Sequence, residues 1–241
     1  MPNPYFRFKQ FTIHHDRCAM KVTTDSCFFG AWVAREMQNE KLKMKNVLDI
    51  GAGTGLLSLM IAQKNEIDID AVEIDESASG QAKENIEASP WKERIWLFNE
   101  DILAFQPAKK YDCIISNPPF YENELASEQL KKNIAHHGEK LTISQLLKTI
   151  KDHLEADGIF FLMLPFKRKE EVDRLLRKNE LYVINSVILS QSVKHAPFRM
   201  IIKGATKTTV QVDPIFVSIW DEHQQYTSQF VELLKDYYLY L

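Results

Sequence analysis

Cysteine is scarce in this chain of 241 residues, which contains only Cys18, Cys27 and Cys113. Three cysteines without a C-x-x-C spacing exclude a disulfide framework and a cysteine-rich zinc site, so we expect reduced thiols and no metal. No apolar run reaches the roughly 18 residues that span a bilayer, and the first residues do not resemble a signal peptide. These absences predict a cytoplasmic protein without a membrane segment.

An excess of charge of either sign is also missing, because 30 basic residues face 33 acidic ones and leave a formal net charge of −3. This balance excludes a broadly cationic nucleic-acid coat, although it leaves room for a local basic face. Several clusters of lysine and arginine are present, each equally typical of a solvated surface. The cluster that most favours substrate contact contains Lys194 and Arg199, beside an expected hairpin of residues 183–189 and 198–202.

Apolar residues are plentiful, at 45% of the chain, which is enough to build one core. Short apolar runs typical of strands alternate with helical patterns, and they fall at residues 47–50, 67–73, 95–99, 111–116 and 159–164. This alternation predicts an α/β fold with a doubly wound, mainly parallel sheet. We expect a final edge strand at 215–220 and a last helix at 228–240. Ligands of such sheets bind at the carboxyl ends of the strands.

A glycine-rich turn follows the first of these strands and precedes a helical pattern, with glycines at Gly51, Gly53 and Gly55. Glycine lets a backbone approach a ligand closely. The spacing is G-x-G-x-G, which differs from the G-x-G-x-x-G of dinucleotide-binding enzymes. Asp49, just before the turn, would repel a diphosphate and would favour a ligand with a cationic end.

Acidic residues end the next two strands. Glu73 lies 24 residues after Asp49 (73 − 49), close to the spacing of about 20 at which a carboxylate binds ribose hydroxyls. Asp75 competes for that role, and we expect it instead to cap the following helix. Asp101, after the third strand, is either an acceptor for an adenine amino group or an ordinary loop acid.

The strand at 111–116 ends in an unusual tetrapeptide, Asn117-Pro118-Pro119-Phe120. Proline cannot extend a central strand, so the chain must leave the sheet at this point. The resulting stiff loop presents an amide side chain, carbonyl oxygens and an aromatic ring. Such groups suit a planar substrate with an exocyclic amino group, although a proline-punctuated turn with a core phenylalanine explains the tetrapeptide equally well.

Taken together, these motifs resemble the class I S-adenosylmethionine-dependent methyltransferases, and in particular those that methylate amino groups. The segments 8–11, 15–25, 85–91 and 93–95 narrow the similarity to the bacterial tRNA1(Val) adenine-37 N6-methyltransferases. The resemblance implies a seven-stranded Rossmann-like sheet with a C-terminal antiparallel hairpin, in one domain of residues 1–241. It implies S-adenosyl-L-methionine as cofactor and tRNA as partner, without an obligatory protein partner.

The resemblance also assigns roles to residues. Residues 1–30 would cap the cofactor and face the substrate, and residues 45–241 would form the core. Thr24 and Asp25 would lie at the methionine end of the cofactor, although Asp25 is equally typical of a helix N-cap. The cofactor set would then comprise Thr24, Asp25, Asp49, Gly51, Gly53, Gly55, Glu73, Asp101 and Asn117.

For catalysis we expect the Asn117 side-chain oxygen and the Pro118 carbonyl to accept the two hydrogens of adenine N6, with Phe120 stacked on the base. Pro119, Phe120, Lys194 and Arg199 would contact the substrate. The same loop would also hold a glutamine side-chain amide or guanine N2, so a protein glutamine N5-methyltransferase and an rRNA guanine N2-methyltransferase stay open. A DNA adenine methyltransferase and a non-catalytic nucleotide- or RNA-binding module are less favoured.

Overall fold

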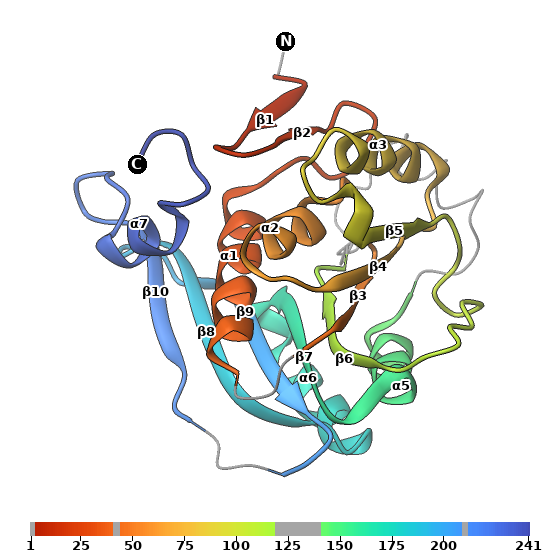
Figure 1. Cartoon of the computed structure of the whole chain (residues 1–241). Helices are drawn as coiled ribbons and strands as arrows, with labels where there is room; N and C mark the ends of the chain where they lie inside the picture. The colour runs from red at the N-terminus through yellow and green to blue at the C-terminus, as the bar shows by residue number, and fades with distance from the viewer. Residues whose placement is uncertain (1–2, 41–43, 119–140, 209–211) are drawn as a thin grey trace.

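An eight-stranded sheet with helices on both faces forms the centre of the computed structural model, as Figure 1 shows. The structure describes residues 3–40, 44–118, 141–208 and 212–241. The strands are β1 (Tyr5–Arg7), β2 (Thr12–His14), β3 (Asn46–Ile50), β4 (Asp68–Val72), β5 (Ile95–Phe98), β6 (Tyr111–Ser116), β7 (Leu154–Pro165), β8 (Tyr182–Ser192), β9 (Pro197–Ala205) and β10 (Ile215–Trp220). The helices are α1 (Thr24–Asn39), α2 (Leu56–Lys64), α3 (Glu76–Glu87), α5 (Ile143–His153), α6 (Lys169–Lys178) and α7 (Ser228–Leu234).

The strand order in the sheet is β10-β8-β9-β7-β6-β3-β4-β5, and a separate hairpin joins β1 to β2. Strands β7, β6, β3, β4 and β5 run parallel, whereas β9 is antiparallel to both of its neighbours and β10 is parallel to β8. The predicted fold class and C-terminal hairpin are therefore confirmed. The edge strand expected at residues 215–220 is also confirmed, and it brings the sheet to eight strands where the resemblance implied seven.

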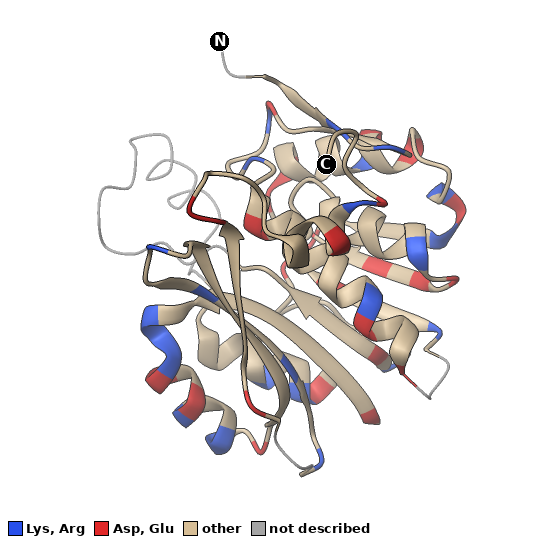
Figure 2. Ribbon diagram, turned by 90° about the vertical axis from the view of Figure 1, so that its left-hand side faces the viewer, with Lys and Arg blue, Asp and Glu red and all other residues tan. Residues whose placement is uncertain are grey.

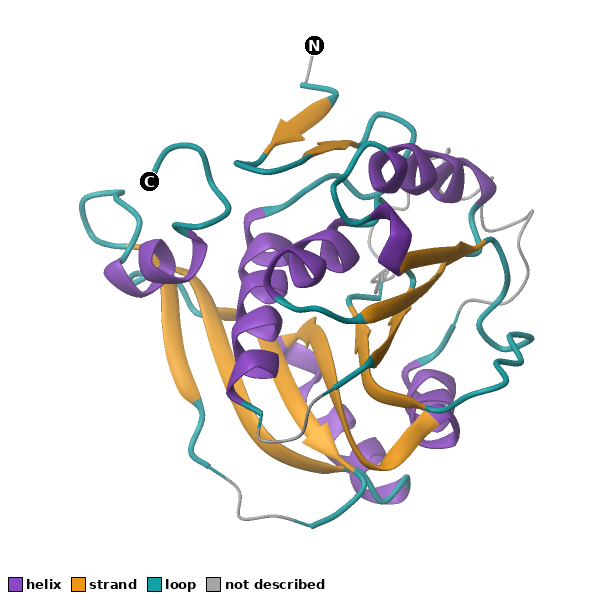
Figure 3. Cartoon of the chain, viewed as in Figure 1, coloured by secondary structure: helices purple, strands orange, loops and turns teal. Residues whose placement is uncertain are grey.

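The core lies on both faces of the sheet, in two layers that Figure 3 shows as helices in front of and behind the strands. Buried side chains of α1, α2 and α7 form one cluster with one face of the strands, and those of α5 and α6 form the other. Parallel central strands that are covered on both faces read as continuous apolar runs, which is the pattern of β3 and β6.

The register of the central strands brings the predicted site residues to one edge. Ile50, the last residue of β3, pairs with Val72 of β4 and Ser116 of β6, and Val72 pairs with Phe98 of β5. The chain segments that follow these four residues therefore leave the sheet side by side. This common carboxyl edge is the ligand-binding edge of a doubly wound sheet.

The strands on the β7 side continue past this edge. Ser116 pairs with Leu162 of β7, Leu162 with Ile202 of β9, and Ile202 with Ser186 of β8. From Ser186, β8 runs six residues further to Ser192 (192 − 186). At about 3.3 Å per residue, β8 extends roughly 20 Å beyond the end of β6, and β9, which begins five residues before Ile202 at Pro197, extends about 16 Å. They form a wall beside the end of β6.

The last helix is shorter than expected, because α7 ends at Leu234 instead of reaching residue 240. Beyond it the chain turns to meet the N-terminal segment: Lys9 N donates to the Tyr237 carbonyl at 2.8 Å, and Phe8 forms a bridge with Tyr238. Both tyrosines are buried there. None of the helices in the described ranges has the length and apolar character needed to cross a membrane.

Candidate active site

The glycine-rich turn after β3 has left-handed backbone at all three glycines, with φ of 73° at Gly51, 57° at Gly53 and 78° at Gly55. A Cβ atom at Gly51 or Gly53 would have no neighbour within 4 Å, whereas at Gly55 it would contact Ile86 of α3 at 3.6 Å. The first two glycines therefore face open space that a ligand can enter, and the third closes the turn onto α3.

Asp49 is fully buried one residue before the end of β3. Its Oδ2 accepts a hydrogen bond from Ser58 Oγ of α2 at 2.6 Å, and its Oδ1 has no hydrogen-bond partner among the described residues. Burial raises the pKa of this carboxyl to about 7. A buried carboxylate oxygen without a donor is an unfavourable arrangement that a cationic or N–H-bearing ligand would relieve.

Glu73 links the end of β4 to the glycine turn. Its Oε2 accepts from Gly53 N at 2.8 Å and its Oε1 accepts from Asp75 N at 2.9 Å. The side chain is buried, and this burial raises its pKa above the usual range. Asp75 accepts a hydrogen bond from Ala78 N at 2.8 Å and is the N-cap of α3, so the role predicted for Asp75 is confirmed.

Among the polar residues that follow β5, Asp101 was predicted for the site and Asn99 was not. Asp101 is exposed, and its Oδ1 accepts from Leu103 N at 2.9 Å. Asn99, which was not singled out, donates through Nδ2 to the Glu73 carbonyl at 2.8 Å and so ties the ends of β4 and β5 together. Ile74, between the two acids of the β4 loop, exposes 42% of its surface and offers an apolar face there.

The proline loop begins directly beside the glycine turn. Ser116, at the end of β6, donates through Oγ to the Ile50 carbonyl at 2.8 Å, which joins the ends of β6 and β3. Asn117 follows, partly exposed and without a hydrogen bond from its side chain to any described residue, and Pro118 is buried. Neighbouring strands lie about 4.8 Å apart, so the amide and the turn are close neighbours. Pro119 and Phe120 lie outside the described residues.

Asp25 and Arg199, predicted for cofactor and substrate respectively, contact each other. Arg199 Nε donates to Asp25 Oδ2 at 2.8 Å, and the Arg199 guanidinium lies 5.4 Å from the Phe198 ring centroid. The alternative of Asp25 as a helix cap was wrong, because Thr23 caps α1 in a reciprocal pair with Ser26. Thr24 is the first residue of that helix.

Lys194 is exposed in the turn between β8 and β9, at the top of the wall. This turn lies beyond the carboxyl edge of the sheet, and the expected contact of Lys194 with the substrate stays a prediction. Helix α6 carries Glu170 and Glu171 in its first turn and Arg177 and Lys178 in its last, and Figure 2 shows charges of both signs on the ribbon, so this helix is not a purely basic face.

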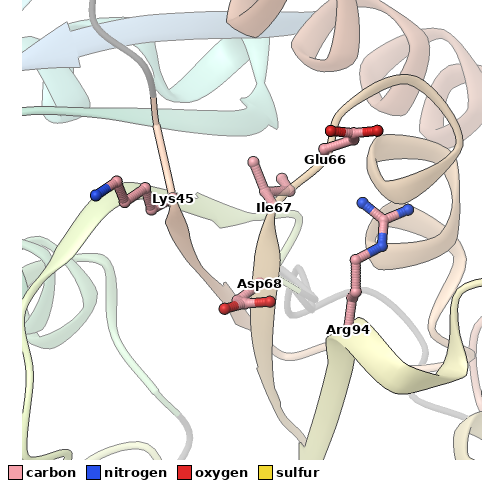
Figure 4. Close-up of a pocket in the computed structure, with 5 residues that line it drawn as sticks. All are labelled: Lys45, Glu66, Ile67, Asp68 and Arg94. Carbon is pink, nitrogen blue, oxygen red and sulfur yellow. The ribbon is translucent and has the colours of Figure 1, made fainter.

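A pocket of about 470 Å³ at the opposite edge of the sheet is lined by Lys45, Glu66, Ile67, Asp68 and Arg94, shown in Figure 4. Two of its five residues are acidic and two are basic. Arg94 is already engaged, because its guanidinium donates to the Asn65 and Ala62 carbonyls at 2.8 and 3.1 Å and closes the end of α2. The pocket lies at the amino ends of β3 and β4, away from every candidate residue of the carboxyl edge.

Comparison with known proteins agrees with this geometry. The family model described as the methyltransferase small domain matches residues 30–179. The tRNA1(Val) (adenine(37)-N6)-methyltransferase of Bacteroides thetaiotaomicron is 37% identical over 243 residues, covering 100% of both chains. The protein of the same name from Dyadobacter fermentans is 39% identical over 241 residues, covering 98% of each chain.

Solved structures support the fold. The crystal structure of a predicted O-methyltransferase from Agrobacterium tumefaciens matches with a TM-score of 0.66 and 13% identity, covering 87% of this chain and 95% of that one. At such low identity the match shows a shared Rossmann-like methyltransferase fold and nothing about the substrate. The sequence relatives decide the family: this chain belongs to the methyltransferase small domain family, in the branch formed by the tRNA1(Val) (adenine(37)-N6)-methyltransferases.

Proposed function

We propose that this protein transfers a methyl group from S-adenosyl-L-methionine to N6 of adenine 37 in tRNA1(Val). Relatives that carry this activity in their names align with the chain over its whole length. The structural observation that carries the proposal is the position of Asn117, which leaves the sheet on the strand next to the glycine turn. A tRNA substrate implies that the protein works in the cytoplasm.

The residues of the carboxyl edge fit the proposed cofactor. Gly51 and Gly53 leave open space beside the turn, and Glu73, which the Gly53 amide holds there, would accept from the ribose hydroxyls. The unsatisfied Oδ1 of Asp49 suits a ligand with a cationic end. Ile74 offers an apolar surface to a nucleobase, and Asp101 offers an acceptor to its amino group. Thr24 and Asp25 would close the methionine end.

When bound, S-adenosyl-L-methionine supplies an electrophilic methyl group, so the protein must mainly align the acceptor and stabilise charge. The Asn117 side-chain oxygen and the Pro118 carbonyl accept the two N6 hydrogens, which directs the nitrogen lone pair toward the methyl group. As the bond from N6 to the methyl carbon forms and the bond from sulfur to that carbon breaks, positive charge would develop on N6 and strengthen both hydrogen bonds. N6 would then release one of its hydrogens as a proton to water. The two acceptors therefore stabilise the transition state more than the ground state.

The substrate side is formed by the proline loop and the wall of β8 and β9. Pro119 and Phe120 would contact the base, with Phe120 stacked on it, as the resemblance implies. Lys194, exposed at the top of the wall, would contact a tRNA phosphate. Because Arg199 Nε donates to Asp25, the N–H groups on the other two guanidinium nitrogens would be the ones that bind RNA. A base in a tRNA loop is cheaper to unstack than one in a duplex.

The test is methyl transfer by the purified protein with S-adenosyl-L-methionine and unmodified transcripts. We expect label in tRNA1(Val) and none in the transcript with guanine in place of adenine 37. Ribosomal RNA and a release factor should stay unlabelled. Transfer to either of these, in preference to the tRNA, would refute the proposed substrate and favour guanine N2 or glutamine N5 methylation.

A further inference from the structure

The segment of residues 14–25, which we name the strap, runs from the last residue of β2 to the first two residues of α1 and lies over the carboxyl edge of the sheet. Its Cys18 thiol donates to Gln81 Oε1 of α3 at 3.4 Å. Burial raises the pKa of this thiol to about 12, and the negative charges of Glu73 and Asp75 add to the rise. At its end, Asp25 is paired with Arg199 of β9. The strap therefore spans the edge from the side of α3 to the wall.

Asn85 of α3 joins the start of the strap to the glycine turn. Its Oδ1 accepts from His14 N at 2.9 Å, and its Nδ2 donates both to the His14 carbonyl and to the Thr54 carbonyl, each at 2.9 Å. The side chain is 2% exposed. A single buried amide thus uses both of its N–H groups to hold the strap and the glycine turn in one arrangement.

A second α3 residue supports the same segment. Gln81 Oε1 accepts from Arg17 N at 2.9 Å, and Gln81 Nε2 donates to Asp16 Oδ1 at 2.8 Å. Arg17 also forms an ion pair with Glu84. These contacts hold the strap alone, whereas Asn85 bonds both the strap and the turn.

We propose that Asn85 is a positioning residue for cofactor binding. By holding the strap against the glycine turn it keeps the cofactor pocket formed before the cofactor arrives. The identity of the cofactor in this inference rests on the proposed function. Asn85 would act through the strap and the turn, without touching the cofactor or the substrate. Catalysis itself would belong to Asn117 and Pro118, which are not among the partners of Asn85 given above.

The physical reason is the energetic asymmetry of buried hydrogen bonds. Without the Asn85 amide, His14 N–H, the His14 carbonyl and the Thr54 carbonyl lose their partner inside the protein, so the closed arrangement becomes less favourable than one that is open to water. Apparent affinity falls in proportion to the population of the binding-competent state. If one molecule in ten keeps the strap in place, the cofactor binds about tenfold more weakly, and turnover at saturating cofactor changes little.

The experiment compares Asn85→Ala with Asn65→Ala. Asn65 makes the same kind of contact, with Nδ2 donating to the Ala34 and Ile61 carbonyls at 3.2 and 3.1 Å, but it lies at the amino edge. Calorimetric titration with S-adenosylhomocysteine should show about tenfold weaker binding for Asn85→Ala and unchanged binding for Asn65→Ala. Without ligand, hydrogen exchange of the amides of residues 14–25 should be faster in Asn85→Ala only.

Equal affinity of Asn85→Ala and wild type, or an equal loss in both variants, would overturn the inference. Should Asn85→Ala not fold, Gln81→Ala serves in its place, because it releases the strap and leaves the turn intact. For Gln81→Ala we expect a smaller loss of cofactor affinity and faster hydrogen exchange in the strap. Wild-type affinity together with wild-type exchange would count against the proposal. Wild-type transfer to tRNA, measured in parallel, tests the proposed function separately, since the exchange result needs no substrate.

Discussion

The carboxyl of Asp49 gives the account a quantitative prediction, because burial raises its pKa to about 7. A ligand that places a cationic group beside Asp49 binds the ionised carboxylate and not the protonated form. With a pKa near 7, about a tenth of the carboxyl is ionised at pH 6 and about nine tenths at pH 8. The cofactor should therefore bind about tenfold more tightly at pH 8 than at pH 6.

The same group makes the stability of the cofactor-free protein depend on pH. The folded-state pKa is raised from the ordinary 3.8, so the folded protein binds more protons than the unfolded chain between about pH 4 and pH 7. The free energy of unfolding should consequently fall as pH rises through that window. A shift of about three pKa units at 1.36 kcal/mol each sets an upper bound of about 4 kcal/mol.

Asp49→Asn tests both effects, because it keeps an acceptor for Ser58 and removes the titration. Calorimetric titration with S-adenosyl-L-methionine at pH 6, 7 and 8 measures the affinity, and urea unfolding at the same pH values measures stability. The exposed and remote Asp157→Asn serves as control. Any pH dependence of affinity that arises from titration of the cofactor itself will be present in both Asp49→Asn and Asp157→Asn. If Asp49→Asn keeps the full pH dependence of the wild type, the assignment of Asp49 is refuted.

Three further predictions concern the turn, the wall and the core. Gly53→Ala puts a side chain at φ of 57° into open space, so stability should fall by about 1–2 kcal/mol while cofactor affinity, followed by titration, falls by more. A loss of cofactor affinity no larger than the loss of stability would argue against a ligand beside Gly53. Lys194→Glu should raise the KM for tRNA and reduce the salt slope of tRNA binding by about one, and unchanged tRNA binding would exclude the contact. Lys203→Ala should cost about 3–5 kcal/mol in urea unfolding, because it leaves Glu36 and Glu40 without their buried partner; a loss below 1 kcal/mol would show that water compensates them.

Much of the fold followed from local pattern. The buried parallel strands were predictable because each is a short apolar run, and the residues at their carboxyl ends were predictable because parallel strands present those ends at one edge. The cap at Asp75 was predictable because capping needs only the few residues that follow it. These features depend on neighbours in the sequence, which is why the sequence alone identified them.

The remaining features depend on contacts between residues distant in sequence. The Asp25–Arg199 pair joins positions that are 174 residues apart in the sequence, and Asn85 and His14 are 71 residues apart. No local pattern distinguishes these side chains from ordinary surface residues. The end of α7 at Leu234 has the same origin, because helical propensity continues beyond it while the tertiary pairing of Tyr238 with Phe8 competes successfully.

The central claim, that the amide of Asn117 holds the reacting nitrogen beside the cofactor, is tested most directly by Asn117→Ala. The measurement is N6-methyladenosine in tRNA1(Val), quantified by nucleoside mass spectrometry under single-turnover conditions, with cofactor affinity determined in parallel. The account predicts about a hundredfold or greater loss of transfer rate, as for removal of a transition-state hydrogen bond, and cofactor affinity close to wild type. Transfer at a near wild-type rate would contradict it.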